Sequence, residues 1–121
     1  MVENFEEITQ KLTPDEEMML PVIMRVLKAH SHADPIKGPD IVIAVNSQKS
    51  KYGFRLNLNE ARLRKIVNHI RVNALLPVIA TSSGYFVSED PELILSQVRS
   101  LVDRAEGIRA AARGLATFLP N

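Results

Sequence analysis

The chain of 121 residues contains no cysteine, which excludes disulfide bonds, thiolate catalysis and cysteine-based zinc fingers. Aromatic residues are scarce, with four phenylalanines, two tyrosines and no tryptophan, and they do not cluster on a basic strand. This scarcity argues against the stacking platform that binds single-stranded nucleic acids. Stability must therefore come from packing alone.

Long apolar runs are also missing, since none approaches the roughly 20 residues that a membrane-spanning helix needs. The acidic start, Met1 to Glu7, lacks the basic and apolar regions of a secretory signal. A length of 121 residues suits one compact domain with one core. We therefore expect a globular cytoplasmic protein.

Motifs that carry chemistry are sparse. The sequence has no glycine-rich phosphate loop, no Ser-His-Asp order and no carboxylate pair at a defined spacing. His30, His32 and Asp34 form the only cluster that resembles metal ligands, but a nearby fourth ligand is missing. We therefore expect no enzyme, no bound metal and no cofactor.

Charge is distributed unevenly along the chain, although the formal net charge is only +1. The first 17 residues carry six carboxylates against a single lysine, whereas residues 49–71 carry seven basic residues against the single carboxylate of Glu60. A local positive field attracts polyanions whatever the charge of the whole chain. The middle of the chain is therefore the candidate for binding a polyanion.

Capping signals and apolar spacing predict two helices in the first part of the chain. Thr13 and Glu16 form a capping box that starts a helix from Pro14 to about His30, with Pro21 leaving a kink or a later start open. Ile36 suits a short strand, and a second helix then runs from Gly38 to Asn46 or Lys49. The β-branched run within this second helix leaves a buried strand as the alternative.

The basic segment predicts a turn followed by a third helix. Ser50–Leu56 is typical of a turn, and Asn57 with Glu60 resembles a second capping box, after which a helix runs to Asn73. The packed face of this helix is expected to contain Leu63, Ile66, Val67, Ile70 and Ala74.

The last third of the chain predicts a hairpin and a long helix. Strand-forming residues flank Ser82, Ser83 and Gly84, as in a β-hairpin. Asp90 and Pro91 then start a helix with an apolar seam at alternating steps of four and three residues. The seam consists of Ile94, Val98, Leu101, Ala105, Ile108, Ala112 and Leu115.

The order helix, short strand, helix, basic turn, basic helix, hairpin and long helix is that of a winged helix-turn-helix. The stretch Asn57–Ser88, which includes LNEARLRKIVNHIRVNALLPVIATSSGYFVS, resembles the recognition helix and wing of small bacterial and phage-encoded winged-helix DNA-binding proteins. This resemblance implies an α+β, mostly α fold with a DNA-binding domain over residues 13–90. Residues 1–12 would form a loose arm, and residues 91–121 a C-terminal helix that is a candidate dimerisation element.

In that family the helix before the hairpin enters the major groove, so the resemblance implies that residues 58–73 read DNA and that residues 81–84 form the wing tip. Helical geometry places basic and amide groups on the face opposite the apolar one. We expect base reading by Arg62, Arg64, Lys65 and Asn68, with His69 at the flank, phosphate contacts by Lys49, Lys51 and Arg55, and wing contacts by Ser82 and Ser83. As surface residues, Arg62, Arg64 and Lys65 should tolerate alanine with little loss of stability.

The seam of the last helix has two interpretations. It exceeds what a small domain needs to cover, so we expect a homodimer formed through this helix, with packing inside one chain as the alternative. The resulting hypothesis is a dimeric double-stranded-DNA-binding protein, acting as a transcriptional regulator or as a replication accessory factor of a phage or mobile element. The alternatives are a winged-helix protein-interaction module of a replication or packaging complex, and a regulator that responds to a small molecule.

Overall fold

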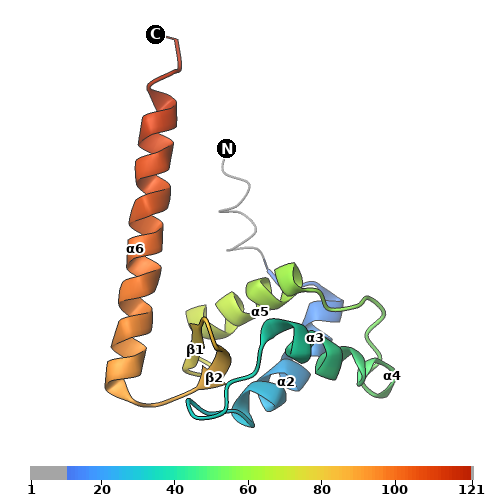
Figure 1. Ribbon diagram of the computed structural model, residues 1–121. Coiled ribbons are helices and arrows are strands. Elements are labelled where there is room, and N and C mark those ends of the chain that lie inside the picture. The colour runs from blue at the N-terminus through green and yellow to red at the C-terminus, as the bar shows by residue number, and fades with distance from the viewer. Residues whose placement is uncertain (1–10, 121) are drawn as a thin grey trace. The chain divides into compact units, whose positions relative to one another are not determined.

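The computed structural model describes residues 11–120, which form two compact units (Figure 1). The first unit ends at Ser88 and the second begins at Glu89. Both units are mostly helical. The only sheet in the described residues is a two-stranded antiparallel hairpin. The predicted α+β, mostly α class is therefore confirmed. The first ten residues of the predicted arm lie outside the described part.

The elements are α2 (Pro14–Lys28), α3 (Gly38–Asn46), α4 (Lys49–Tyr52), α5 (Glu60–Val72), β1 (Val78–Thr81), β2 (Gly84–Val87) and α6 (Pro91–Ala116).

Helix α2 starts with the predicted capping box. The Glu16 amide donates to Thr13 Oγ1 at 3.2 Å, and the Thr13 amide donates to Glu16 Oε1 at 2.8 Å. The helix continues through Pro21 to Lys28, so the alternative of a later start is wrong. Pro21 lies in the middle of this 15-residue helix and on its exposed side.

Helix α3 settles the ambiguity of the β-branched run in favour of the helix. Ile41 and Val45, four residues apart, are buried, whereas Ile43 between them is exposed. A strand would have pointed all three side chains to the same face. Gly38 and Pro39 start the helix as predicted.

The connection from α3 to α5 differs from the predicted turn in two respects. Residues Lys49–Tyr52 form the short helix α4, which ends at Gly53 in the left-handed conformation with φ of 82°. The predicted capping box of Asn57 and Glu60 is wrong, because the N-cap is Asn59, whose Oδ1 accepts the Arg62 amide at 2.8 Å. Leu58, directly before this cap, is buried, and the helix begins only after Leu58.

The predicted hairpin is present and pairs Val78 with Val87 and Thr81 with Gly84, so Gly84 belongs to the second strand and not to the turn. The expected short strand at Ile36 is a single bridge, in which Ile36 and Tyr85 exchange hydrogen bonds of 2.9 and 2.7 Å. Gly84 is required at this point because a Cβ atom would lie 2.6 Å from the Ile36 carbonyl oxygen, and because its φ is 132°. The hairpin is thereby joined to the connection between α2 and α3.

One aliphatic core holds the first unit together. Its buried side chains come from α2, α3, α5, β1 and the loop before α5, and they include Met19, Ile23, Leu27, Ile41, Val45, Phe54, Leu58, Leu63, Ile66, Val67, Ile70 and Val78. The predicted face of α5 is confirmed except for Ala74, which is exposed. Ala74 has φ of 52° after the last helical residue, so it leaves the helical stripe.

The second unit contains α6, which is 26 residues long and contains no buried residue. Asp90 caps it, with Oδ1 accepting the Glu92 amide at 3.0 Å. All seven predicted seam residues lie inside this helix. No helix within residues 11–120 has both the length and the apolar character needed to cross a membrane.

Candidate nucleic-acid interface

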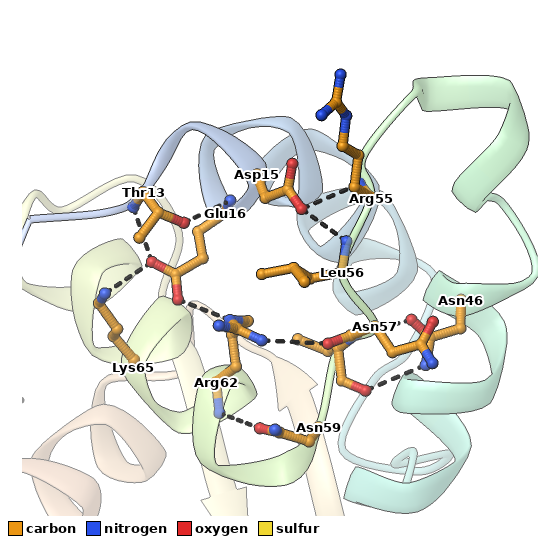
Figure 2. A network of polar contacts seen from close by, with 11 residues as sticks. Thr13, Asp15, Glu16, Asn46, Arg55, Leu56, Asn57, Asn59, Arg62 and Lys65 are labelled. Atoms are coloured by element: carbon orange, nitrogen blue, oxygen red, sulfur yellow. Dashed lines mark hydrogen bonds and ion pairs between the residues drawn. The ribbon is translucent and has the colours of Figure 1, made fainter.

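The carboxylate of Glu16 is the centre of a polar network between α2 and α5 (Figure 2). Glu16 is only 2% exposed to solvent. Lys65 Nζ donates to Oε1 at 2.7 Å, and Arg62 Nε donates to Oε2 at 2.9 Å. Oε1 also accepts the Thr13 amide, so both carboxylate oxygens are hydrogen-bonded.

The pKa of Glu16 reflects the balance between burial and these partners. Burial alone raises the pKa, because it disfavours the charged form. The hydrogen bonds from Lys65, the Thr13 amide and Arg62, together with the charge of Lys65, outweigh burial and lower the pKa from 4.5 to about 2. The carboxylate is therefore ionised at neutral pH, and the network holds the two cations with one anion.

A second carboxylate on the same turn of α2 holds the loop before α5. Asp15 Oδ2 accepts the backbone amides of Arg55 at 3.0 Å and Leu56 at 2.7 Å (Figure 2). On the side of α3, the amide side chain of Asn46 donates to the Leu58 carbonyl at 3.1 Å and accepts the Leu58 amide at 2.8 Å. The start of α5 is thus anchored on both α2 and α3.

The predicted outward orientation of Arg62 and Lys65 is wrong. Their side chains are only 24% and 15% exposed, and both end on Glu16. Arg62 Nη1 also donates to the Asn57 carbonyl at 3.2 Å. Helical geometry correctly excluded these residues from the apolar face, but the first turn of α2 covers their side of the helix. They position α5, and their removal should affect stability.

The exposed stripe of α5 contains Ala61, Arg64 and Val72 at helical spacing, with half-buried Asn68 between them. The side chain of Arg64 is exposed and makes no hydrogen bond or ion pair with any residue in 11–120. Asn68 is engaged in interactions of its own. His69 is half-buried, and its Nδ1 lies 3.4 Å from the side-chain nitrogen of Asn73. Of the predicted reading residues, Arg64 therefore presents its charge to solvent most fully.

The predicted phosphate-binding residues lie on α4 and in the loop that follows. Arg55 is exposed, and its guanidinium points away from the Glu16 network (Figure 2). Lys51 lies 5.7 Å from the centre of the Tyr52 ring, which Arg25 of α2 also approaches. Lys49 is half-buried and donates to Asn57 Oδ1 at 3.0 Å. Arg55 and Lys51 are consequently the more accessible of the three cations.

The hairpin tip is small and uncharged. Ser82 and Ser83 are both exposed, and the Ser83 amide donates to Thr81 Oγ1 at 3.1 Å. The four residues 81–84 contain no basic side chain. This tip offers hydroxyl groups to a ligand and carries no positive charge.

The histidines of the candidate metal cluster make other contacts. His30 Nδ1 lies 2.9 Å from the Asp34 carbonyl oxygen and 3.6 Å from Asp34 Oδ2. His32 stacks on Phe86, with ring centroids 5.1 Å apart. Across the described residues, no group of three histidine, cysteine, aspartate or glutamate side chains is arranged to hold a metal ion.

Three residues of the interface escaped sequence reasoning: Asp15, Glu16 as an ion-pair partner, and Asn46. Glu16 was recognised only as a capping residue, and its partners lie 46 and 49 residues further along the chain. Its local role in the capping box gave no signal of these distant contacts. Comparison of the chain with protein-family models, curated proteins and solved structures finds no match.

Proposed function

We propose that this protein is a winged-helix protein that binds double-stranded DNA, with α5 entering the major groove. The observation that carries this proposal is the set of exposed cations Lys51, Arg55 and Arg64 on α4, the following loop and α5. A rigidly held helix with an outward arginine is suited to the reading of base edges.

The Glu16 network reduces the positive charge of this region but leaves it basic. One carboxylate faces two cations, so the cluster of Glu16, Arg62 and Lys65 retains a net positive charge. Arg55 and Arg64 add to this charge from exposed positions. Long-range attraction of a polyanion depends on the summed field, to which partly buried cations also contribute.

Different residues serve different parts of the proposed contact. Arg64 is placed to hydrogen-bond to base edges, and Asn68 adjoins it one turn later on α5. Lys49, Lys51 and Arg55 would contact phosphates, which supply affinity and orientation. Ser82 and Ser83 would donate to the backbone of the duplex from the hairpin tip. Arg62 and Lys65 hold α5 in place through Glu16.

Self-association through α6 completes the proposal. The helix carries seven apolar seam positions and no buried residue, and such a face packs against another helix. A dimer doubles the number of DNA contacts and thereby raises affinity for a paired site. The protein would act by occupying such sites, in the control of transcription or in the replication of a phage or mobile element.

The direct test is a fluorescence-anisotropy titration of random-sequence duplex DNA at low and at physiological salt. If several phosphates are contacted, affinity falls steeply as salt rises. In the double variant Arg55→Ala/Arg64→Ala, we expect binding to weaken by about tenfold or more, which corresponds to roughly 1.4 kcal/mol. Its thermal unfolding should change little, because both side chains are exposed.

The matched control is Arg99→Ala/Arg113→Ala, which removes the same charge from exposed positions of α6. We expect this control to keep most of its affinity. Equal losses in the two double variants would show that only total charge matters and would reject α5 as the reading helix. Absence of salt-sensitive binding in the unaltered protein would reject DNA binding.

A second candidate is a protein-interaction module, and one observation favours it. Val72 at the end of the exposed stripe of α5 is 73% exposed, and Leu75 just beyond it is 41% exposed. Apolar side chains at such a position suit a protein partner better than a phosphate backbone. In this case, Val72→Ser would weaken partner binding, whereas Arg64→Ala would have little effect.

A further inference from the structure

Helix α6 carries a seam whose side chains alternate in size. Its central positions are Leu101, Ala105, Ile108 and Ala112, with Val98 before them and Leu115 after them. In heptad terms, Val98 and the two alanines share position a, whereas Leu101, Ile108 and Leu115 share position d. Large and small residues therefore occupy different positions of the repeat.

This segregation distinguishes the two ways in which two copies of α6 can pair. In a parallel pair, position a meets position a, so Ala105 and Ala112 would each face the same alanine of the second copy. The two alanine layers, one on each side of the Ile108 layer, leave space unfilled between the helices, which forfeits packing contacts. In an antiparallel pair, position a meets position d, and every alanine faces a branched side chain.

We propose that two copies of this protein pair through α6 in an antiparallel arrangement. Ala105 packs against the partner's Ile108, Ala112 packs against the partner's Leu101, and Val98 packs against the partner's Leu115. Each of these contacts occurs twice by symmetry, so the layers fill the seam evenly from Val98 to Leu115. This inference rests on the self-association proposed above and adds its orientation and register.

The basic residues that flank the seam independently favour the same arrangement. In a parallel pair, Arg104 at position g would lie beside the partner's Arg109 at position e, and this contact would occur on both sides of the dimer. Like charges at these positions oppose association. In the antiparallel register, Arg104 lies beside the partner's Ala111, and Arg109 lies beside the partner's Val102. Arg109 also keeps its ion pair with Glu106 of its own helix.

The antiparallel arrangement determines where the DNA-binding units are attached. Each α6 begins at Pro91, directly after the first unit, so the two attachment points lie at opposite ends of the helix pair. A helix of 26 residues is roughly 40 Å long at 1.5 Å per residue. Such a dimer would bind two separated sites or two DNA segments, whereas a parallel pair would attach both units at the same end.

Disulfide trapping in the full chain tests the orientation, and the absence of cysteine makes every introduced thiol unique. The single variants Leu101→Cys and Ala112→Cys are purified, mixed in equal amounts and oxidised without DNA. We expect the mixed disulfide dimer to dominate, because its two thiols face each other, and each variant alone to cross-link poorly. Intact mass spectrometry separates the mixed dimer from the two homodimers.

Val98→Cys with Leu115→Cys provides a second, independent pair, and light scattering of the unaltered protein reports its oligomeric state. Homodimers that dominate in both mixtures would overturn the antiparallel arrangement in favour of the parallel one. A dimer by light scattering that yields no mixed disulfide in either pair would overturn the proposed register. A monomer by light scattering would reject self-association itself, and the DNA titration would still test the proposed function.

Discussion

Helices α5 and α6 have similar sequence patterns but different surroundings. Both start at a side-chain cap, Asn59 in α5 and Asp90 in α6, and both carry one apolar face. Helix α5 buries four apolar side chains in the core of its unit, whereas α6 buries none. An amphipathic pattern thus predicts that a helix needs a partner, but it does not say whether the same chain supplies it.

The polar faces of the two helices differ in the same way. Arg62 and Lys65 of α5 bind a buried carboxylate of another helix, and both pairs are shielded from water. The ion pair of α6 joins Arg109 to Glu106 three residues away, and both side chains are exposed. Exposed pairs of this kind contribute little to stability, whereas removal of one member of a shielded pair is costly.

The largest expected effect comes from alanine substitution at one isoleucine of each helix. Ile66→Ala in α5 should destabilise the first unit by about 2–5 kcal/mol, because it leaves a cavity in the core. Ile108→Ala in α6 should leave the unfolding of the first unit unchanged, because Ile108 is exposed in a separate unit. Urea unfolding at low protein concentration measures both. Equal destabilisation by the two variants would contradict the contrast between the helices.

A smaller effect should appear in the acid stability of the first unit. The pKa of Glu16 is lowered from 4.5 to about 2, so the folded state favours the ionised form. The resulting stabilisation is complete above pH 4.5 and is lost as the pH falls toward 2. It corresponds to about 3 kcal/mol, at about 1.4 kcal/mol per pKa unit. Urea unfolding between pH 7 and pH 2 measures this loss.

Substitution of the carboxylate isolates the contribution of Glu16 to that acid dependence. Glu16→Gln should be less stable at pH 7 and should lack this part of the loss in acid. Glu17→Gln, at an exposed carboxylate on the same turn of α2, is the matched control and should follow the unaltered protein. If Glu16→Gln and the unaltered protein lose the same stability between pH 5 and pH 2, the network does not hold Glu16 ionised.

The smallest expected effect concerns the end of α5. Ala74 adopts φ of 52°, which is unfavourable for a residue with a Cβ atom. Ala74→Gly removes this strain, although glycine loses more backbone entropy on folding, so the net gain should be at most about 1 kcal/mol. Thermal unfolding should show a small rise in the midpoint. A fall would mean that the strain is smaller than the entropic cost.

The sequence predicted the elements of the fold well where the signal is local. The capping box at Thr13, the helix that starts at Gly38 and the hairpin around Ser82 depend on neighbouring residues, and the structure contains all three. The order of elements followed from these local signals. Whether α6 pairs with a second copy stays a prediction.

Errors arose where contacts between distant segments decide the outcome. Asn57 and Asn59 are equally good caps by residue type, and the contacts of buried Leu58 with Asn46 favour the second. Arg62 and Lys65 lie outside the apolar face of α5, so their interaction with α2 depends on the placement of that helix. Helical periodicity describes one helix, and it contains no information on which neighbouring carboxylate will neutralise its cations.

The hydrogen bonds from Arg55 and Leu56 to Asp15 make an exposed loop a sensor of tertiary structure. Backbone amides in a loop usually exchange their protons rapidly with solvent, because such loops open easily. These two amides donate to the carboxylate of Asp15, which lies 40 residues before Arg55 and 41 before Leu56 in the sequence. Their exchange with deuterium will therefore report the separation of α2 from the loop before α5, a motion that leaves the helices themselves intact.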